Sequence, residues 1–223
     1  MGKPRARGSR LTTPDEAAAA WSRLHHGLDP HGNRLLWCWL RAMWWLATPL
    51  TRLRVPPLVI TALGAALAVV AASISGLAWL ALILVVASVV CDGLDGAVAA
   101  LGNTASSLGA VADKLADRIA DVAFVVVIWR CGAPGWLAVL TAAGVLSVEA
   151  VREAVRGPVV ITVGERPSRV VCTVLACASA QVSAAQASAA QASAEWPATV
   201  CACVLLGLSV IACGQLVAAG RAT

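Results

Sequence analysis

Acidic side chains are scarce in this chain of 223 residues. Asp and Glu together number 12, and all charged residues make up only 13% of the sequence. Apolar residues make up 59%, and the mean hydropathy is +0.79. This composition excludes an ordinary soluble domain, and the length leaves room for no more than one compact bundle. The sequence therefore predicts an integral membrane protein.

The cysteines also lack a pattern that would give them a chemical role. There are 8 of them, scattered through the apolar segments, and none forms a CxxC pair. This favours small buried hydrophobic side chains over a metal site or a disulfide framework. Three histidines, His25, His26 and His31, have no cysteine or acidic partner at ligand spacing, so we expect them in a surface loop.

Apolar stretches of about 18 residues or more, the length that crosses a bilayer, recur along the chain. They lie at residues 57–75, 77–99, 106–130, 134–151, 167–185 and 196–218. We therefore expect an all-α integral membrane protein with six transmembrane helices, in a membrane domain that covers residues 55–223.

Residues 1–54 are predicted to form a cytoplasmic region with a basic tail and a juxtamembrane amphipathic helix. Thr13 followed by Pro14, Asp15 and Glu16 is typical of a helix start. Further on, four tryptophans lie between residues 35 and 53, together with two arginines. Because tryptophan favours the membrane interface, we expect this segment to lie on the cytoplasmic leaflet and not to form a seventh span.

The basic residues are unevenly distributed along the chain. Of the 17 Lys and Arg, more than half lie at or before Arg54, and with six spans only Arg130 falls on the outer side. This asymmetry follows the positive-inside rule and predicts a multi-pass protein of the cell membrane with both termini in the cytoplasm. No nucleic-acid-binding fold accompanies the net charge of +5, so we expect membrane lipids and no nucleic acid as partners.

Four aspartates flank the junction between the second and third predicted spans. Asp92 and Asp95 are three residues apart, and Asp113 and Asp117 are four apart, so on helices each pair shares one face. A carboxylate near hydrocarbon is costly unless a charge compensates it. Two divalent cations would neutralise four carboxylates and could hold the oxygens of a diphosphate. We therefore expect a metal-dependent enzyme with its active site on the cytoplasmic face.

The stretch CDGLDGAVAALGNTASSLGAVADKLAD, from Cys91 to Asp117, resembles the CDP-alcohol phosphotransferase signature D-x2-D-G-x2-A-R-x8-G-x3-D-x3-D. It matches this signature in register at every fixed position except the arginine. The matching residues are Asp92, Asp95, Gly96, Ala99, Gly109, Asp113 and Asp117. Members of that family have six spans and a cytoplasmic site, in agreement with the predicted topology.

The resemblance implies roles for these residues. The four aspartates, Asp92, Asp95, Asp113 and Asp117, would bind two Mg²⁺ or Mn²⁺ ions, and Asp117 would also be the catalytic base. Gly96, Ala99 and Gly109 would line the cytidine-diphosphate pocket. Such enzymes transfer the phosphatidyl group of CDP-diacylglycerol to a hydroxyl acceptor and release CMP. A homodimer is implied in the same way.

The sequence departs from the signature at Ala100, where the family has arginine. A methyl group cannot donate a hydrogen bond to a phosphate or to a carboxylate. This departure keeps a catalytically inactive homologue open as an alternative. Lys114 or Arg118 are the nearby residues that could supply the missing charge.

A second group of basic residues follows the fourth predicted span. Arg152, Arg166 and Arg169 resemble the arginines that bind the acceptor's phosphate in phosphatidylinositol-phosphate and phosphatidylglycerol-phosphate synthases. The planar guanidinium suits that task, although these arginines could also be ordinary membrane anchors. The resemblance favours inositol phosphate or glycerol phosphate as the acceptor.

Two other functions stay open at this point. One is a cardiolipin synthase, which would use phosphatidylglycerol as its acceptor. The other is a divalent-cation transporter, whose carboxylates would lie near the bilayer midplane between inverted repeats. The sequence shows no such repeat, and its aspartates lie at one edge of the predicted spans.

Overall fold

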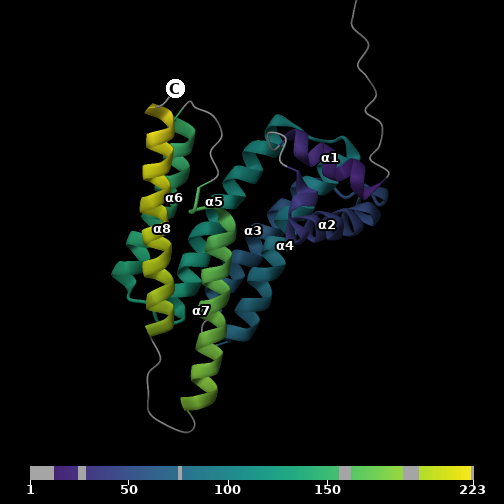
Figure 1. Cartoon of the computed structure of the whole chain (residues 1–223). Helices are drawn as coiled ribbons and strands as arrows, with labels where there is room; N and C mark the ends of the chain where they lie inside the picture. The colour runs from purple at the N-terminus through teal and green to yellow at the C-terminus, as the bar shows by residue number, and fades with distance from the viewer. Residues whose placement is uncertain (1–12, 25–28, 75–76, 156–161, 188–195, 222–223) are drawn as a thin grey trace, which may run out of the picture. The chain divides into compact units, whose positions relative to one another are not determined.

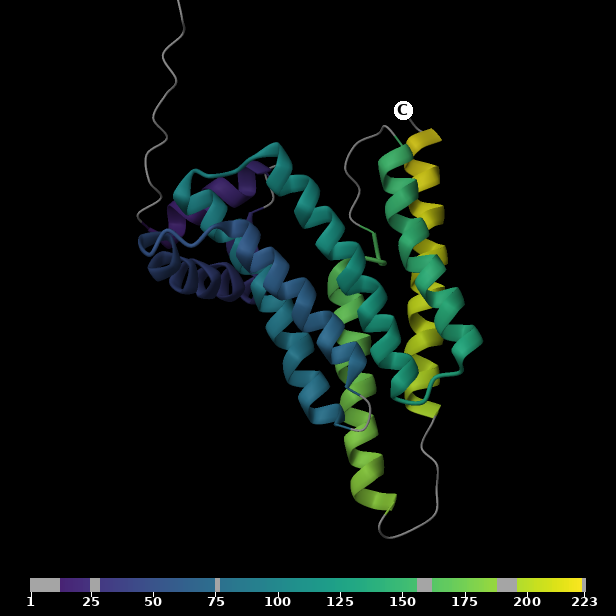
Figure 2. The same ribbon diagram turned by 180° about the vertical axis from the view of Figure 1, so that it is seen from behind.

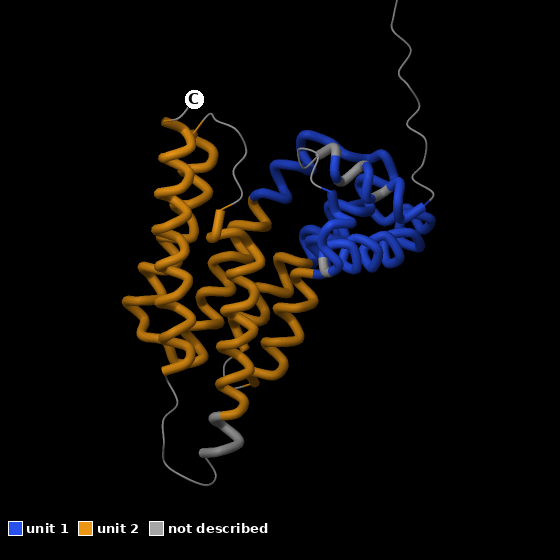
Figure 3. Tube along the Cα trace, in the orientation of Figure 1, with its two compact units in different colours: residues 1–63, 90–114 blue, residues 64–89, 115–223 orange. Residues whose placement is uncertain are grey.

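The computed structural model describes residues 13–24, 29–74, 77–155, 162–187 and 196–221. Every regular element within these residues is a helix, so the all-α prediction is confirmed (Figure 1). Contacts divide the chain into two compact units, one of residues 1–63 and 90–114 and the other of residues 64–89 and 115–223 (Figure 3). The basic tail before residue 13 and the histidines at 25 and 26 lie outside the described residues.

The first unit begins with a helix at the predicted position. Helix α1 covers Pro14–Leu24. The Thr13 hydroxyl accepts a hydrogen bond from the Glu16 N–H, and the Glu16 carboxylate accepts one from the Thr13 N–H, each at 3.2 Å. This reciprocal pair is a capping box, which satisfies backbone donors that the first turn leaves open. A short 3₁₀ helix, η1 (Pro30–Gly32), follows and carries the exposed His31.

Helix α2 (Arg34–Arg52) is the tryptophan-rich segment, and it contacts both α1 and η1. Its buried Ala47 packs with Ile60, Val98 and Leu101 in the core of the first unit. Large apolar side chains on its other faces are exposed, among them Trp45 at 70%. The helix is therefore present and amphipathic, and its location at a membrane interface stays a prediction.

Three long helices link the two units along the chain. They are α3 (Pro57–Ser73), α4 (Ala78–Gly102) and α5 (Ser107–Arg130). The first unit takes the start of α3, the end of α4 and the start of α5, which contain most of the signature residues. Helix α5 ends at a turn in which Gly132 has φ of 115°, a left-handed conformation that glycine adopts without strain.

The second unit holds the remaining parts of these helices together with α6 (Gly135–Ala154), α7 (Arg166–Ala187) and α8 (Trp196–Arg221). Helix α8 lies beside α6 and also contacts α7 (Figure 1 and Figure 2). Phe124 and Ile128 of α5 are fully buried in the apolar core of this unit. The packing brings the polar ends of α5, α6 and α7 together.

The structure contains one helix for each predicted span. Among the described residues, α4, α6 and α8 are long and apolar enough to cross a membrane, whereas α3 is apolar but has only 17 residues. Charged side chains in the first half of α5 and polar side chains in α7 make these two helices less apolar. These helices support a membrane protein, and the count of six spans stays a prediction.

Candidate functional site

Two of the four aspartates come together in the first unit. Asp92 lies on α4 and Asp113 on α5, and each offers a carboxylate oxygen within 4.8 Å of the other. Both residues are half-buried. Carboxylate oxygens are the hard ligands that Mg²⁺ and Mn²⁺ prefer, so this donor pair fits a divalent cation.

Asp95 is more deeply placed than Asp92, with 5% of its surface exposed. The hydroxyl of Thr61, on α3, donates a hydrogen bond to its carboxylate. Because a buried carboxylate is costly without hydrogen-bond partners, Thr61 stabilises and orients the side chain of Asp95. The contact therefore links the start of α3 to the signature.

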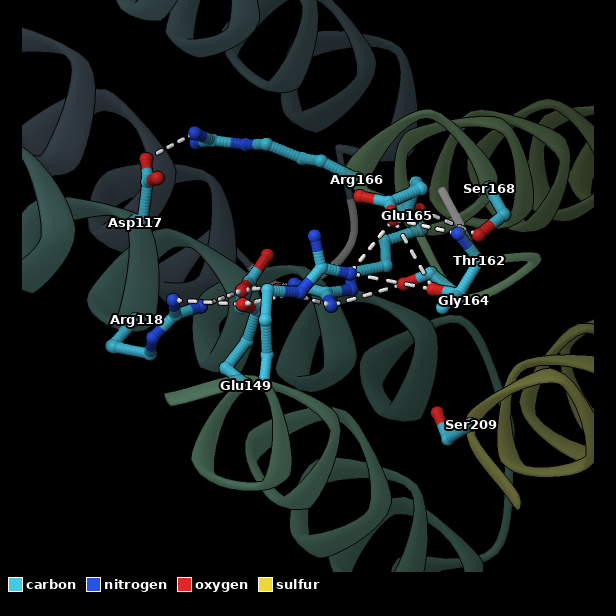
Figure 4. A network of polar contacts seen from close by, with 12 residues as sticks. Asp117, Arg118, Glu149, Thr162, Gly164, Glu165, Arg166, Ser168 and Ser209 are labelled. Atoms are coloured by element: carbon cyan, nitrogen blue, oxygen red, sulfur yellow. Dashed lines mark hydrogen bonds and ion pairs between the residues drawn. The ribbon is translucent and has the colours of Figure 1, made fainter. Parts of the chain in front are cut away.

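Asp117 follows Asp113 by one turn of α5 and faces the same side of that helix. It belongs to the second unit, where its carboxylate accepts a hydrogen bond from the guanidinium of Arg166 (Figure 4). Arg166 is the first residue of α7. The structure thus pairs the predicted catalytic base with a predicted phosphate-binding arginine.

The glycines near the aspartates differ in what surrounds them. A Cβ added at Gly93 would meet Trp39 Cζ2 at 2.8 Å and Met43 Sδ at 3.0 Å, so α2 packs directly on the backbone of α4 there. At Gly96 nothing lies within 4 Å of such a Cβ. Gly96 therefore leaves open space next to Asp95.

The other residues predicted to line the nucleotide pocket are Ala99 and Gly109. Ala99 is half-buried on α4, and Ala100 beside it is exposed. The N–H of Gly109 donates to Ser106 Oγ at 3.0 Å, which caps the start of α5. Gly109 therefore belongs to the first turn of the helix that carries Asp113.

Arg152, near the end of α6, contacts two glutamates. Its Nη2 donates to Glu165 Oε1 at 2.7 Å, and its Nε lies 3.5 Å from Glu149 Oε2. Glu165 also accepts a hydrogen bond from the Thr162 N–H at 3.0 Å. Partial burial raises the pKa of Glu165, but the hydrogen bonds from Arg152 and Thr162 outweigh burial and hold the pKa below its usual value.

Arg169 lies deeper, with 4% of its surface exposed. Its guanidinium donates to the Asp121 carboxylate, to Glu149 Oε1 at 3.0 Å and to the Gly164 carbonyl at 3.0 Å. Arg118 completes the group, since its Nη1 lies 3.1 Å from Asp121 and its Nη2 lies 3.3 Å from Glu149. A connected network of charged side chains thus joins α5, α6 and α7.

Comparison with known proteins decides the family. The family model for CDP-alcohol phosphatidyltransferase matches residues 44–219, which is most of the chain. The chain belongs to the CDP-alcohol phosphatidyltransferase family. Members of this family are transferases. No curated protein and no solved structure matches the chain.

The site residues predicted from the sequence of this CDP-alcohol phosphatidyltransferase did not include two polar residues of this region. Asp121 is 1% exposed and contacts Arg169, although it lies outside the signature. The regular spacing of Asp113, Asp117 and Asp121 along α5 is the signal that could have indicated it. Thr61 is the other missed residue, and its sequence neighbourhood contains no sign of a contact with Asp95.

Proposed function

We propose that this CDP-alcohol phosphatidyltransferase transfers the phosphatidyl group of CDP-diacylglycerol to a hydroxyl of a phosphorylated polyol and releases CMP. Family membership supports the transfer from a CDP-alcohol. The observation that carries the proposal is the approach of Asp92 and Asp113, whose oxygens lie within 4.8 Å on the two helices that carry the signature. Glycerol phosphate and inositol phosphate are the favoured acceptors.

The metal ligands in this proposal are Asp92, Asp95, Asp113 and Asp117. Their oxygens suit two Mg²⁺ or Mn²⁺ ions. When bound, such ions would neutralise the diphosphate of the donor and stabilise the charge that develops on the leaving CMP. Thr61 would keep Asp95 oriented toward its ligand, in the manner of an outer-shell hydrogen bond.

The proposed chemistry uses Asp117 as the base. Its carboxylate takes the proton from the acceptor hydroxyl, whose oxygen then bonds to the phosphorus that carries the diacylglycerol. The bond from that phosphorus to the CMP oxygen breaks, and CMP leaves with the electron pair. Gly96, Ala99 and Gly109 would line the nucleotide pocket, where the open space at Gly96 leaves room for the donor.

The acceptor's phosphate would bind to arginines of the second unit. Arg166 and Arg152 have side chains that are 21% and 31% exposed, so both can be reached by a small anion. Arg166 already contacts the carboxylate of Asp117. A phosphate held at Arg166 would therefore place the acceptor hydroxyl near its base. Arg169 is the third predicted phosphate ligand, and its side chain is much more deeply buried than those of Arg166 and Arg152.

The cellular setting follows from this function. We place the protein in the cell membrane as a homodimer, with its active site on the cytoplasmic face, where soluble phosphorylated polyols are found. Residues 1–54 would form the cytoplasmic region, and residues 55–223 would form the membrane domain. Three helices with the length and apolarity of membrane spans support this placement.

The test is an assay of CMP release by the purified protein in detergent. CDP-diacylglycerol and Mg²⁺ or Mn²⁺ are supplied with inositol phosphate, glycerol phosphate or phosphatidylglycerol in turn, and Asp117→Asn is the control. We expect release with a phosphorylated polyol, lost with a chelator and in the control. Release with phosphatidylglycerol alone would identify a cardiolipin synthase.

If folded protein released no CMP with any acceptor, the proposal would be contradicted. The variant Ala100→Arg then separates two causes, because Ala100 is exposed and an arginine there restores the signature. Activity gained in this variant would identify an inactive homologue. If Ala100→Arg also released no CMP, the donor or the acceptor would have to differ from those proposed.

A further inference from the structure

Asp121 and Arg169 form the most deeply buried ion pair of the second unit among the described residues. Asp121 is 1% exposed and Arg169 is 4% exposed, and the guanidinium donates directly to the carboxylate. Asp121 lies outside the signature. A charge at this depth would be very costly without partners, and each of the two residues is the most deeply buried partner of the other.

Arg169 is surrounded by partners from three parts of the chain. Asp121 comes from α5, Glu149 from α6, and the Gly164 carbonyl from the segment before α7. A phosphate that bound Arg169 would have to displace one of these oxygens from a side chain that is almost fully buried. The contacts favour a residue that holds three segments together over a residue that binds a soluble acceptor.

The charges of the network also balance. It contains three arginines and three carboxylates, namely Arg118, Arg152, Arg169, Asp121, Glu149 and Glu165. The network as a whole therefore has no surplus positive charge. Arg166 forms an ion pair with Asp117, which is not one of these six residues.

Glu149 connects the buried pair to Arg152. Its Oε1 accepts from Arg169 at 3.0 Å, and its Oε2 lies 3.5 Å from the Nε of Arg152. Movement of Arg169 would therefore move Glu149 and weaken its electrostatic contact with the Arg152 guanidinium. Arg152 would then be held by Glu165 alone among these carboxylates.

We propose that Asp121 and Arg169 are positioning residues, which act through Glu149 to fix Arg152 for the phosphate of the acceptor. This inference rests on the proposed function, in which Arg152 binds that phosphate. It assigns Arg169 a holding role in place of direct contact with the acceptor, and it adds Asp121 to the functional residues.

The charge balance gives a sharp test. Asp121→Asn leaves the buried network with one surplus positive charge, since Arg169 then has only Glu149 as a carboxylate partner, and Arg169→Gln leaves it with one surplus negative charge, since Asp121 then has only Arg118. The double variant removes both charges and is neutral again. Breaking a buried pair is far more destabilising than replacing both partners, so the double variant should recover what each single variant loses.

The measurements are the midpoint of thermal unfolding in detergent and the KM values for the two substrates, with the acceptor that supports CMP release in the wild type. We expect the unfolding midpoint of each single variant to lie several degrees below that of the wild type. Each should also raise the KM for the acceptor roughly tenfold and leave the KM for CDP-diacylglycerol unchanged. The double variant should return close to the wild type in both respects. Arg130→Gln, at an exposed arginine at the end of α5, is the matched control and should change nothing.

Direct phosphate binding by Arg169 predicts the opposite pattern. Arg169→Gln would then raise the KM for the acceptor by the same factor with or without Asp121, and the effects on unfolding would be additive. That result overturns the inference. If the single variants do not fold, a folded and active double variant is the predicted rescue, and an unfolded double variant contradicts it.

Failure of the proposed function would look different. If the wild type releases no CMP with any acceptor, the proposed reaction is wrong, and so is the positioning role that depends on it. The unfolding midpoints of the four proteins would still show whether Asp121 and Arg169 depend on each other. If the enzyme is active but the two substitutions change the unfolding midpoint additively, only the positioning role is wrong.

Discussion

Arg166 donates a hydrogen bond to the carboxylate of Asp117, and the two residues belong to helices that are far apart in the sequence (Figure 4). In the proposed reaction Asp117 takes a proton from the acceptor and Arg166 binds the acceptor's phosphate. The contact therefore places acceptor recognition beside proton transfer. A phosphate that engages Arg166 would also weaken its hold on Asp117 and leave the carboxylate free to act as a base.

The variant Arg166→Gln should weaken binding of a phosphorylated acceptor. Hydrogen bonds to charged groups contribute about 1.5–3 kcal/mol, so the KM for the acceptor should rise about ten- to hundredfold. The KM for CDP-diacylglycerol should stay unchanged, as should both values in the control Arg130→Gln. Steady-state CMP release measures these constants, and an unaltered KM for the acceptor would exclude Arg166 from its binding site.

Removal of the hydroxyl that contacts Asp95 should weaken metal binding. Thr61→Val keeps the shape of the side chain but leaves the buried carboxylate without this donor. Loss of an outer-shell partner typically lowers metal affinity about 10–100-fold. The Mg²⁺ concentration for half-maximal CMP release should increase accordingly. Thr61→Ser retains the hydroxyl and should behave as the wild type, so equal Mg²⁺ requirements in all three proteins would argue against the role of Thr61.

A methyl group at Gly93 should disturb the packing of α2 on α4. An added Cβ would lie 2.8 Å from Trp39 Cζ2, closer than carbon atoms approach, whereas Gly96 has nothing within 4 Å. Gly93→Ala should therefore unfold at a lower temperature, by about 1–3 kcal/mol of stability. Gly96→Ala should keep its stability and raise the KM for CDP-diacylglycerol. Equal unfolding temperatures of the two variants would contradict this packing.

Glu165 should make stability depend on pH at the acidic end. Its pKa in the folded protein is lowered from the usual 4.5, so its ion pair with Arg152 stabilises the fold above that pH. This contribution is lost as the pH falls through the lowered pKa. Glu165→Gln should be less stable than the wild type at neutral pH, and the difference should shrink as the pH is lowered.

Thermal unfolding across the acidic range measures this effect. Glu153→Gln removes an exposed glutamate of the same region and controls for the loss of one negative charge. A difference between Glu165→Gln and the wild type that stays constant with pH would show that the ion pair does not stabilise the folded state.

Much of the helical structure follows from local sequence. Thr13, followed by Pro14, Asp15 and Glu16, predicts the start of α1, and the structure has a capping box there. Apolar length predicts the remaining long helices because each must bury its backbone polar groups internally. The signature predicts which aspartates share a helix face, since helical periodicity alone fixes that relation.

The polar contacts between helices could not be predicted in this way. Thr61 and Asp95 are 34 residues apart, and Arg169 and Asp121 are 48 apart, so their meeting depends on how the helices pack. The resemblance predicted a phosphate-binding role for Arg169. The sequence identifies this arginine but does not show that its side chain is buried. Side-chain burial is a tertiary property, and it distinguishes Arg169 from Arg166 and Arg152.

The most direct test of the central claim is the stoichiometry of the reaction. Purified protein is given CDP-diacylglycerol, Mg²⁺ and glycerol phosphate or inositol phosphate, and CMP and new lipids are quantified by mass spectrometry. We expect equimolar CMP and a phospholipid that carries the acceptor, both abolished by chelator and by Asp92→Asn. CMP accompanied only by phosphatidic acid, or acceptor-bearing lipid that forms equally well in Asp92→Asn, would contradict it.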